Sequence, residues 1–196
     1  MAELEVPNPE ELHERGSQTF SRRVALTTAI YAIILSIAAT GANNAVKEML
    51  LKQQQSSDQW AFYQAKVIRE HQYRGQKMVV ETQLADPSTV KGAEREKLAA
   101  LAGKFAEEEK RYNAEKKDIE KDAKKLEHER DLFRERHPYF EFGEVLLQIA
   151  IVSASVSILS TSRQMFWFSL VLAVLGAVLT LNGYSRLFTL PFLHHH

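Results

Sequence analysis

The residues whose types and spacing could do chemistry lie in the second of three long apolar runs. Glu144 and Gln148 are one helical turn apart near the start of this run, and Ser153, Ser157 and Ser160 follow. In one interpretation this polar row lines a water-filled path through a ring of subunits, where repeated Glu144 carboxylates favour cations. In the interpretation that we favour, Glu144 lies at a membrane interface and the serines bond the backbone of their own helix.

Outside this row, the sequence has no catalytic or metal-binding motif. His71, His128 and His137 lack the spacing that places two metal ligands on one helical face. The chain has no cysteine, no glycine-rich phosphate loop, and no nucleophile and base placed together by local spacing. We interpret His194–His196 as part of a purification tag, with a native histidine tail as the alternative. We therefore expect a protein that is not an enzyme and has no cofactor or metal.

Three apolar runs in the chain are long enough to cross a bilayer: Val24–Ala42, Gly143–Ser162 and Met165–Tyr184. They leave too little of the 196 residues for an enzyme-sized core. Basic and acidic residues number 25 each, which gives no electrostatic reason to expect nucleic acid as a partner. The sequence therefore predicts an integral membrane protein whose immediate surroundings are membrane lipids.

Small residues recur at helical spacing along each apolar run. They are Ala25, Ala29, Ala32, Ser36 and Ala39 in the first run, Ala150, Ser153, Ser157 and Ser160 in the second, and Ser169, Ala173, Gly176, Thr180 and Gly183 in the third. Lipid supplies no hydrophobic force between helices, so such rows matter because they allow backbones to approach closely. Three helices of one chain can use only some of these rows. We expect the remainder to face other copies, which predicts a homo-oligomer.

The charged stretch between the first and second runs has the pattern of an antiparallel coiled-coil hairpin. Apolar or aromatic residues recur at every seventh position: Leu98, Phe105, Tyr112, Ile119, Leu126, Phe133 and Phe140. Asp86–Thr89 breaks the helical pattern and predicts the tip, because a proline ends a helix just before itself. His137–Pro138 predicts the return to the membrane.

These patterns together predict an all-α fold of three transmembrane helices with a long antiparallel coiled-coil hairpin between the first and second. The expected segments are a flexible acidic tail (1–22), transmembrane helix 1 (23–42), the hairpin (43–142, tip near 85–89), transmembrane helix 2 (143–162), transmembrane helix 3 (165–185) and a C-terminal tail (186–196).

Aromatic residues on the first arm of the hairpin lie too far from the first apolar run to form an interfacial belt. They are Trp60, Phe62 and Tyr63, and they are followed by Gln64 and Val67. Trp60, Gln64 and Val67 share a helical face, whereas Phe62 and Tyr63 point elsewhere. We expect these five residues to contact a neighbouring subunit, with a separate protein or ligand as the alternative.

Membrane orientation is predicted from the basic residues next to short segments, which are Arg15, Arg22, Arg23 and Arg163. An odd number of spans places all four on one face, which the positive-inside rule makes cytoplasmic. The hairpin would then be periplasmic. Basic residues on the hairpin side, among them Lys47 and Arg186, argue for the reverse orientation, which stays open.

The segment Ser56–Lys66 resembles a bacterial membrane-protein family catalogued as domain of unknown function 4337. A span that ends in Ala42-Asn43-Asn44-Ala45, a hairpin rich in lysine and glutamate, and two closely spaced terminal spans are similar to the layout of that family. The resemblance implies a bacterial inner-membrane location and supports the topology. It supplies no catalytic or binding residues.

The function that we predict is that of a structural scaffold or adaptor: a homo-oligomeric membrane protein that acts through a projecting coiled-coil stalk. The tip of the stalk, near Pro87, would be available to an unknown protein partner. The alternative is an oligomeric pore or channel lined by transmembrane helix 2. A hydrolase or transferase is the third and weakest reading.

Overall fold

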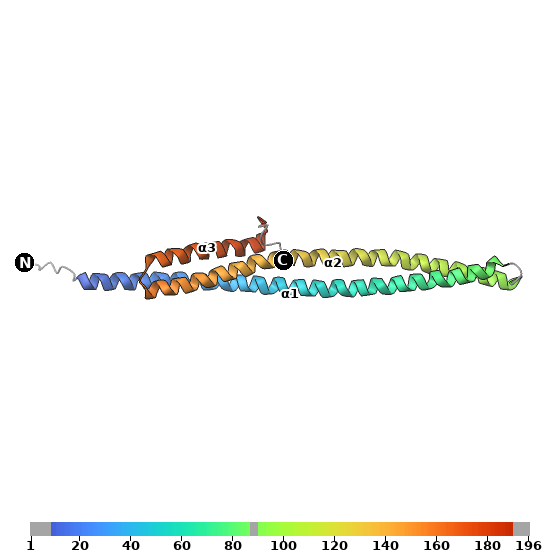
Figure 1. Cartoon of the computed structure of the whole chain (residues 1–196), viewed down its shortest axis with the longest axis horizontal. Helices are drawn as coiled ribbons and strands as arrows, with labels where there is room; N and C mark the ends of the chain where they lie inside the picture. Colours follow the sequence, from blue (N-terminus) through green and yellow to red (C-terminus); the bar gives the residue numbers. More distant parts are fainter. Residues whose placement is uncertain (1–8, 87–89, 190–196) are drawn as a thin grey trace, which may run out of the picture. The chain divides into compact units, whose positions relative to one another are not determined.

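The structure is a computed structural model that describes the backbone of residues 9–86 and 90–189, and their side chains from Ser17 onward. Within these ranges it consists of three α-helices and no strand: α1 (Pro9–Ala85), α2 (Ala93–Leu159) and α3 (Arg163–Ser185) (Figure 1). The predicted all-α class is therefore confirmed for the described part of the chain. The chain divides into two units, residues 49–131 and residues 1–48 with 132–196. We call them the hairpin unit and the bundle unit.

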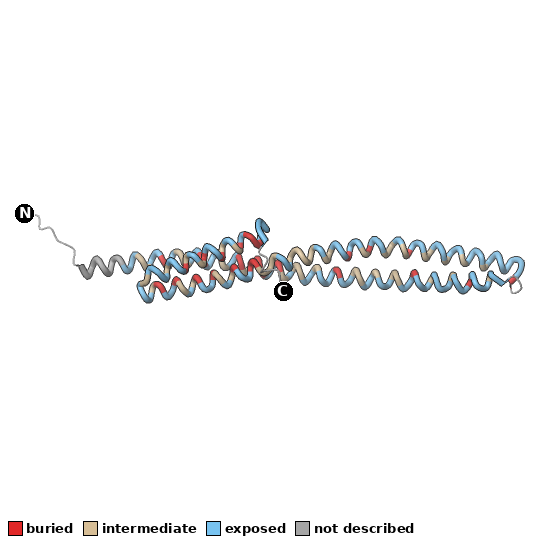
Figure 2. The backbone as a smooth tube through the Cα atoms, turned by 45° about the horizontal axis from the view of Figure 1, so that its top comes forward, coloured by how far each residue is buried: buried red, intermediate tan, exposed pale blue. Residues whose placement is uncertain are grey.

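The hairpin unit consists of one arm from α1 and one from α2, packed side by side (Figures 1 and 2). Gln53 contacts Arg130, Lys66 contacts Glu115, and Lys77 contacts Glu109. Residue numbers fall along α2 as they rise along α1, so the arms are antiparallel. The predicted tip lies between the end of α1 at Ala85 and the start of α2 at Ala93, and residues 87–89 lie outside the described part.

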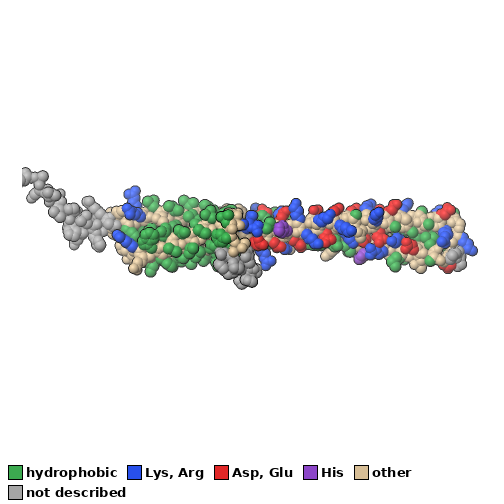
Figure 3. Space-filling view, turned by 90° about the horizontal axis from the view of Figure 1, so that it is seen from above, with side chains coloured by type: hydrophobic (Ala, Val, Ile, Leu, Met, Phe, Trp, Pro, Cys, Tyr) green, Lys and Arg blue, Asp and Glu red, His purple; other side chains and the backbone are tan. Residues whose placement is uncertain are grey.

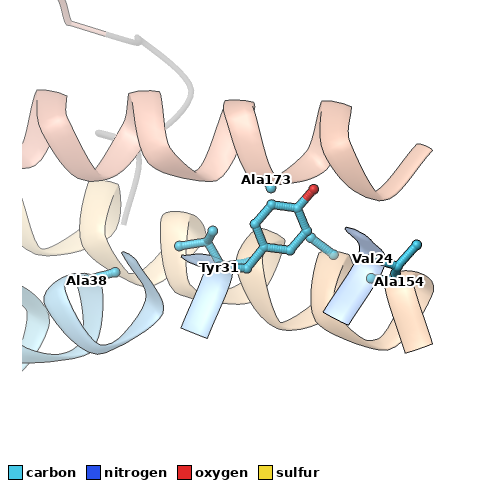
Figure 4. Close-up of a cluster of buried hydrophobic side chains, with 7 residues drawn as sticks. Val24, Tyr31, Ala38, Ala154 and Ala173 are labelled. Carbon is cyan, nitrogen blue, oxygen red and sulfur yellow. The ribbon is translucent and has the colours of Figure 1, made fainter. Parts of the chain in front are cut away.

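The bundle unit packs segments of all three helices around one apolar core. Its buried residues are Val24, Tyr31, Ala38, Leu147, Ala150, Ala154 and Ala173. Figure 4 shows the Tyr31 ring lying among the small side chains from α2 and α3. The small neighbours let the helices pack closely around one large aromatic ring.

The outer surface of the bundle unit is apolar as well. Leu26, Ile33, Val152 and Trp167 are each more than 60% exposed, and Figure 3 shows hydrophobic side chains covering this unit. A soluble protein rarely exposes an apolar surface of this extent. Each of the three helices contains a stretch long and apolar enough to cross a membrane, judged by length and composition.

The predicted extent of the N-terminal tail is wrong. The tail was expected to reach residue 22, but α1 begins at Pro9. Proline is well suited to the first helical position, because its missing N–H has no intrahelical partner there and its φ is already helical.

Pro138, at the predicted return to the membrane, lies inside α2, so the helix continues through it. It removes one backbone hydrogen bond at a cost of about 3 kcal/mol. Burying the next two side chains, Tyr139 and Phe140, offsets this cost at roughly 1.5–3 kcal/mol for each large apolar side chain.

Candidate functional site

The two arms of the hairpin unit meet along a seam that the heptad pattern predicted only in part. Every predicted position on the α2 arm, from Leu98 to Leu126, is buried or half-buried. Tyr73 of α1 stacks on Tyr112 with ring centroids 5.6 Å apart and also contacts Phe105. Between these apolar layers the seam is polar, and its most buried charged residue is Glu70.

Glu70 is the centre of a charged cluster that joins the two arms. Its side chain is only 1% exposed. Asn113 Nδ2 donates to Glu70 Oε1 at 2.9 Å, and Arg74 Nη2 donates to the same oxygen at 3.0 Å. Lys116 Nζ donates to Glu70 Oε2. Both carboxylate oxygens therefore have partners, as a buried charge requires.

A second carboxylate extends the cluster towards the tip. Arg74 Nε and Lys77 Nζ donate to the two oxygens of Glu109, each at 2.7 Å. Arg74 therefore bridges the carboxylates of Glu70 and Glu109. The guanidinium group suits this bridge because its several N–H donors point in fixed directions, and the bond to Glu109 ties the two arms together in one register.

The environment of the cluster favours ionised carboxylates. Burial alone would raise the pKa of Glu70, but the hydrogen bonds from Lys116 and Asn113 outweigh it and lower the pKa below its ordinary value. Hydrogen bonds from Lys77 and Arg74 lower the pKa of Glu109 as well. The cluster is thus held in its charged form at neutral pH, which suits a structural ion-pair network.

Reasoning from the sequence missed Glu70. The signal was its register: Glu70 follows Ser56 and Tyr63 at intervals of seven, and all three lie on the face of α1 that packs against α2. Without the register of the hairpin, a glutamate on a charged helix is most simply interpreted as solvated.

The five residues predicted to contact a subunit or partner fall into two groups in the structure. Trp60 Nε1 donates to Glu127 Oε1 of the other arm at 2.9 Å, and Tyr63 packs edge-on against the Trp60 ring. Trp60, Tyr63 and Val67 are half-buried, whereas Phe62 and Gln64 are exposed. Trp60 therefore has a partner within its own hairpin, and the predicted contact with another chain falls to Phe62 and Gln64.

The predicted polar row of α2 does not form one continuous face. At about 100° per residue, the three serines lie roughly 160–220° around the helix from Glu144. Gln148 Nε2 donates to Glu144 Oε1 at 3.1 Å in an exposed pair, whereas Ser157 is buried and donates to Ala154 O. Ser153 is half-buried, and Ser160 is exposed and donates to Val156 O. The bonds of Ser157 and Ser160 match the interpretation in which the serines bond their own helix.

The rows of small residues in the bundle unit also divide. Ser169, Ala173, Gly176, Thr180 and Gly183 of α3 are all buried. A Cβ atom added to Gly176 would lie 2.9 Å from the carbonyl oxygen of Gly143, so α2 and α3 approach closely at this point. In α1, by contrast, Ala25, Ala29, Ala32 and Ser36 are exposed. These four residues of the first row are thus not covered by the described part of the chain, whereas Ala39 is half-buried.

No group of three or more histidine, aspartate or glutamate side chains that could hold a metal ion occurs within the described residues. The charged cluster has the geometry of a structural network, with every carboxylate oxygen of Glu70 and Glu109 bonded to a nitrogen. It can hold the arms together.

Comparison with known proteins bears on family membership alone. No curated protein and no solved structure matches the chain. The model of one family, the domain of unknown function DUF4337, matches residues 20–186, which include the bundle unit from Phe20 onward and the whole hairpin unit. The chain therefore belongs to the DUF4337 family.

Proposed function

We propose that this protein is a homo-oligomeric integral membrane scaffold or adaptor, held in a bacterial inner membrane by three spans. A coiled-coil hairpin outside the membrane provides its contacts with other protein chains, and the protein performs no catalysis. The observation that carries this proposal is that α1 leaves uncharged surface exposed in both units.

In the hairpin unit, the side of α1 that faces away from α2 is almost free of charge. We call it the outer face of the α1 arm and define it by exposed residues that recur alternately three and four positions apart: Leu51, Gln54, Asp58, Ala61, Ala65, Ile68, Gln72, Gly75, Val79 and Thr82. Asp58 is its one charged member. Ile68 is 67% exposed and Val79 is 59% exposed, which is high for large apolar side chains in contact with water.

The exposed side of the α2 arm differs sharply from this face. Most of its exposed residues are charged, among them Glu107, Lys110, Lys117, Asp118 and Lys121. Both arms must be solvated if the hairpin acts alone, and then no reason exists for one arm to lack charge. A second copy is a suitable occupant of the outer face of the α1 arm, because two uncharged faces meet without desolvating ions or opposing like charges.

The exposed small residues of α1 in the bundle unit support the same proposal. Ala25, Ala29, Ala32 and Ser36 allow another helix to approach closely within lipid. In α3 the equivalent row is already buried by its own chain. A homo-oligomer would bury the first row in the same way.

The test introduces negative charge on the outer face of the α1 arm. The variant Ile68→Glu with Val79→Glu should lower the particle mass to that of a monomer, measured by light scattering after chromatography in detergent. The matched control is Ala106→Glu with Ala114→Glu, which adds the same charge at exposed positions of the α2 arm and should keep the wild-type mass.

A monomeric wild-type protein would overturn the proposal, and so would an Ile68→Glu, Val79→Glu variant that keeps the wild-type mass. Phe62→Ala and Gln64→Ala test the predicted aromatic contact in the same assay. They are cleaner than Trp60→Ala, because Trp60 also bonds Glu127 within the hairpin.

A further inference from the structure

All three helices of the bundle unit line one small cavity. Its volume is about 100 Å³. Asn44, Ala45 and Glu48 line it from α1, Arg136 and Phe140 from α2, and Tyr184 from α3. Since a water molecule takes up about 30 Å³ in the liquid, the cavity has room for a small polar group.

Arg136, which lines this cavity, carries one donor without a partner. Its Nε atom is buried and has no hydrogen-bond partner among the described residues. A buried guanidinium N–H without an acceptor costs about 1–3 kcal/mol or more, because the group is charged. The Arg136 guanidinium carbon lies 5.7 Å from the centre of the Phe133 ring, and this contact holds the guanidinium group beside Phe133. An oxyanion in the cavity would meet the Arg136 guanidinium, which has no ion pair among the described residues.

An acid lines the same cavity without neutralising Arg136. Glu48 and Arg136 form no ion pair with each other, and Glu48 has no ion pair with any other residue that the structure describes. One cavity thus presents a cation and an anion that are kept apart. A ligand that carries both charges, an anion for Arg136 and an ammonium for Glu48, would match it.

The position of the cavity indicates where such a ligand comes from. Ala45 follows the first apolar run, Phe140 precedes the second, and Tyr184 ends the third. If these runs span the bilayer, as the proposed function requires, the cavity lies at the level of the lipid headgroups. Its walls are rigid, because Phe140 packs edge-on against Tyr184 with centroids 4.8 Å apart, and a Cβ atom added to Gly41 or Gly183 would meet the Phe140 ring at 2.6–2.7 Å.

We propose that this cavity binds the headgroup of a zwitterionic aminophospholipid, with the phosphate on Arg136 and the primary ammonium on Glu48. The inference rests on the membrane insertion that the proposed function includes. It does not rest on the oligomer.

The experiment is a lipid titration of the full chain, delipidated in detergent and followed by native mass spectrometry. The probes are dioleoyl phosphatidylethanolamine, phosphatidylglycerol and phosphatidylcholine. Arg136→Gln should weaken binding of phosphatidylethanolamine at least tenfold, and Arg136→Lys, which keeps the cation but loses the guanidinium donors, should recover only part of it. Glu48→Gln should lower the affinity for phosphatidylethanolamine to that for the other two lipids, because only phosphatidylethanolamine presents a primary ammonium to the carboxylate.

The matched controls are Arg163→Gln and Glu141→Gln, which remove the same charges at exposed positions outside the cavity. Equal affinities for phosphatidylethanolamine in Arg136→Gln and Arg163→Gln would overturn the site. A Glu48→Gln variant that still prefers phosphatidylethanolamine would overturn the ammonium assignment. Soluble phosphoethanolamine that binds as tightly as the lipid would overturn a membrane source for the ligand.

The same spectra report the particle mass, so the two proposals fail separately. A monomer whose lipid binding depends on Arg136 contradicts the oligomeric scaffold and keeps the lipid site. An oligomer that binds lipid equally in all variants contradicts the lipid site and keeps the oligomeric scaffold.

Discussion

Replacing Glu70 by glutamine tests whether the buried charged cluster holds the hairpin closed. The substitution keeps the shape of the side chain and removes its charge. It leaves Lys116 without its only acidic partner among the described residues, and it leaves Arg74 with Glu109 alone. Removing one member of a buried ion pair commonly costs 3–5 kcal/mol.

The structure places the expected cost at the low end of that range. The Lys116 side chain is 18% exposed and that of Arg74 is 47% exposed, so both cations can regain water. We therefore expect a loss of about 3 kcal/mol in the free energy that opposes opening of the arms. At 1.36 kcal/mol per factor of ten, this is roughly a hundredfold in the opening equilibrium.

Amide hydrogen exchange of the full chain in detergent measures this opening directly. Backbone amides within about two turns of Glu70 and Asn113 should exchange roughly a hundredfold faster in the glutamine variant. Amides in the bundle unit should keep their wild-type rates. The matched control is Glu120→Gln, which removes a carboxylate whose partner, Lys124, lies on the same helix and is 63% exposed. We expect no change there, because exposed ion pairs contribute little.

Equal exchange rates in the Glu70→Gln and Glu120→Gln proteins would refute the reasoning. The double variant Glu70→Leu with Lys116→Leu gives a second check. Removing both charges leaves neither one buried alone, so the double variant should lose less protection than Glu70→Gln. If the double variant loses more protection than Glu70→Gln, the attraction between Glu70 and Lys116 itself stabilises the closed hairpin.

Four other predictions follow from the described contacts. The pKa values of the carboxylates of Glu70, Glu109, Glu115 and Glu129 are lowered from 4.5. Their contribution to stability is therefore complete above about pH 4.5 and is lost as the pH falls through the lower folded-state values. Amide hydrogen exchange in the hairpin unit should accelerate at acid pH, and an acid-resistant hairpin would contradict this. Gly176→Ala should lower the free energy of unfolding in sodium dodecyl sulfate by about 1–3 kcal/mol, because the new Cβ atom meets the Gly143 carbonyl oxygen. Gly103→Ala places its Cβ atom in open space, so it should be neutral or stabilising. Thr161 has a φ of 51°, which is strained for a β-branched residue, so Thr161→Gly should raise the melting temperature of the bundle unit, and a lower value would show that the turn is not strained. If the protein forms a pore, Glu144→Gln should reduce the cation selectivity of reconstituted protein, and a conductance that is absent or unchanged would count against a pore.

Apolar periodicity was the part of the sequence that predicted structure well. The positions from Leu98 to Leu126 lie on the seam because a repeat of seven places them on one side of a helix, whatever lies opposite. The three apolar runs were found by length and composition alone. Both kinds of inference use only one helix at a time.

Individual side-chain contacts between two helices were not predicted. Glu70 and Lys116 are separated by 46 residues, and they meet only because the hairpin folds in one register. The continuation of α2 through Pro138 was not predicted, since the packing of Tyr139 and Phe140 that outweighs the proline comes from the rest of the bundle. The polar row of α2 is different, because helical geometry alone separates Glu144 from the three serines.

The connection between α2 and α3 has a consequence for biosynthesis. Only residues 160–162 separate Leu159 from Arg163, and Ser162 already caps α3 by accepting a hydrogen bond from Met165 N. If α2 and α3 span a membrane, as proposed, so short a link keeps their adjoining ends together while they enter the bilayer. We would then expect the two helices to insert as a pair, after the hairpin has been synthesised.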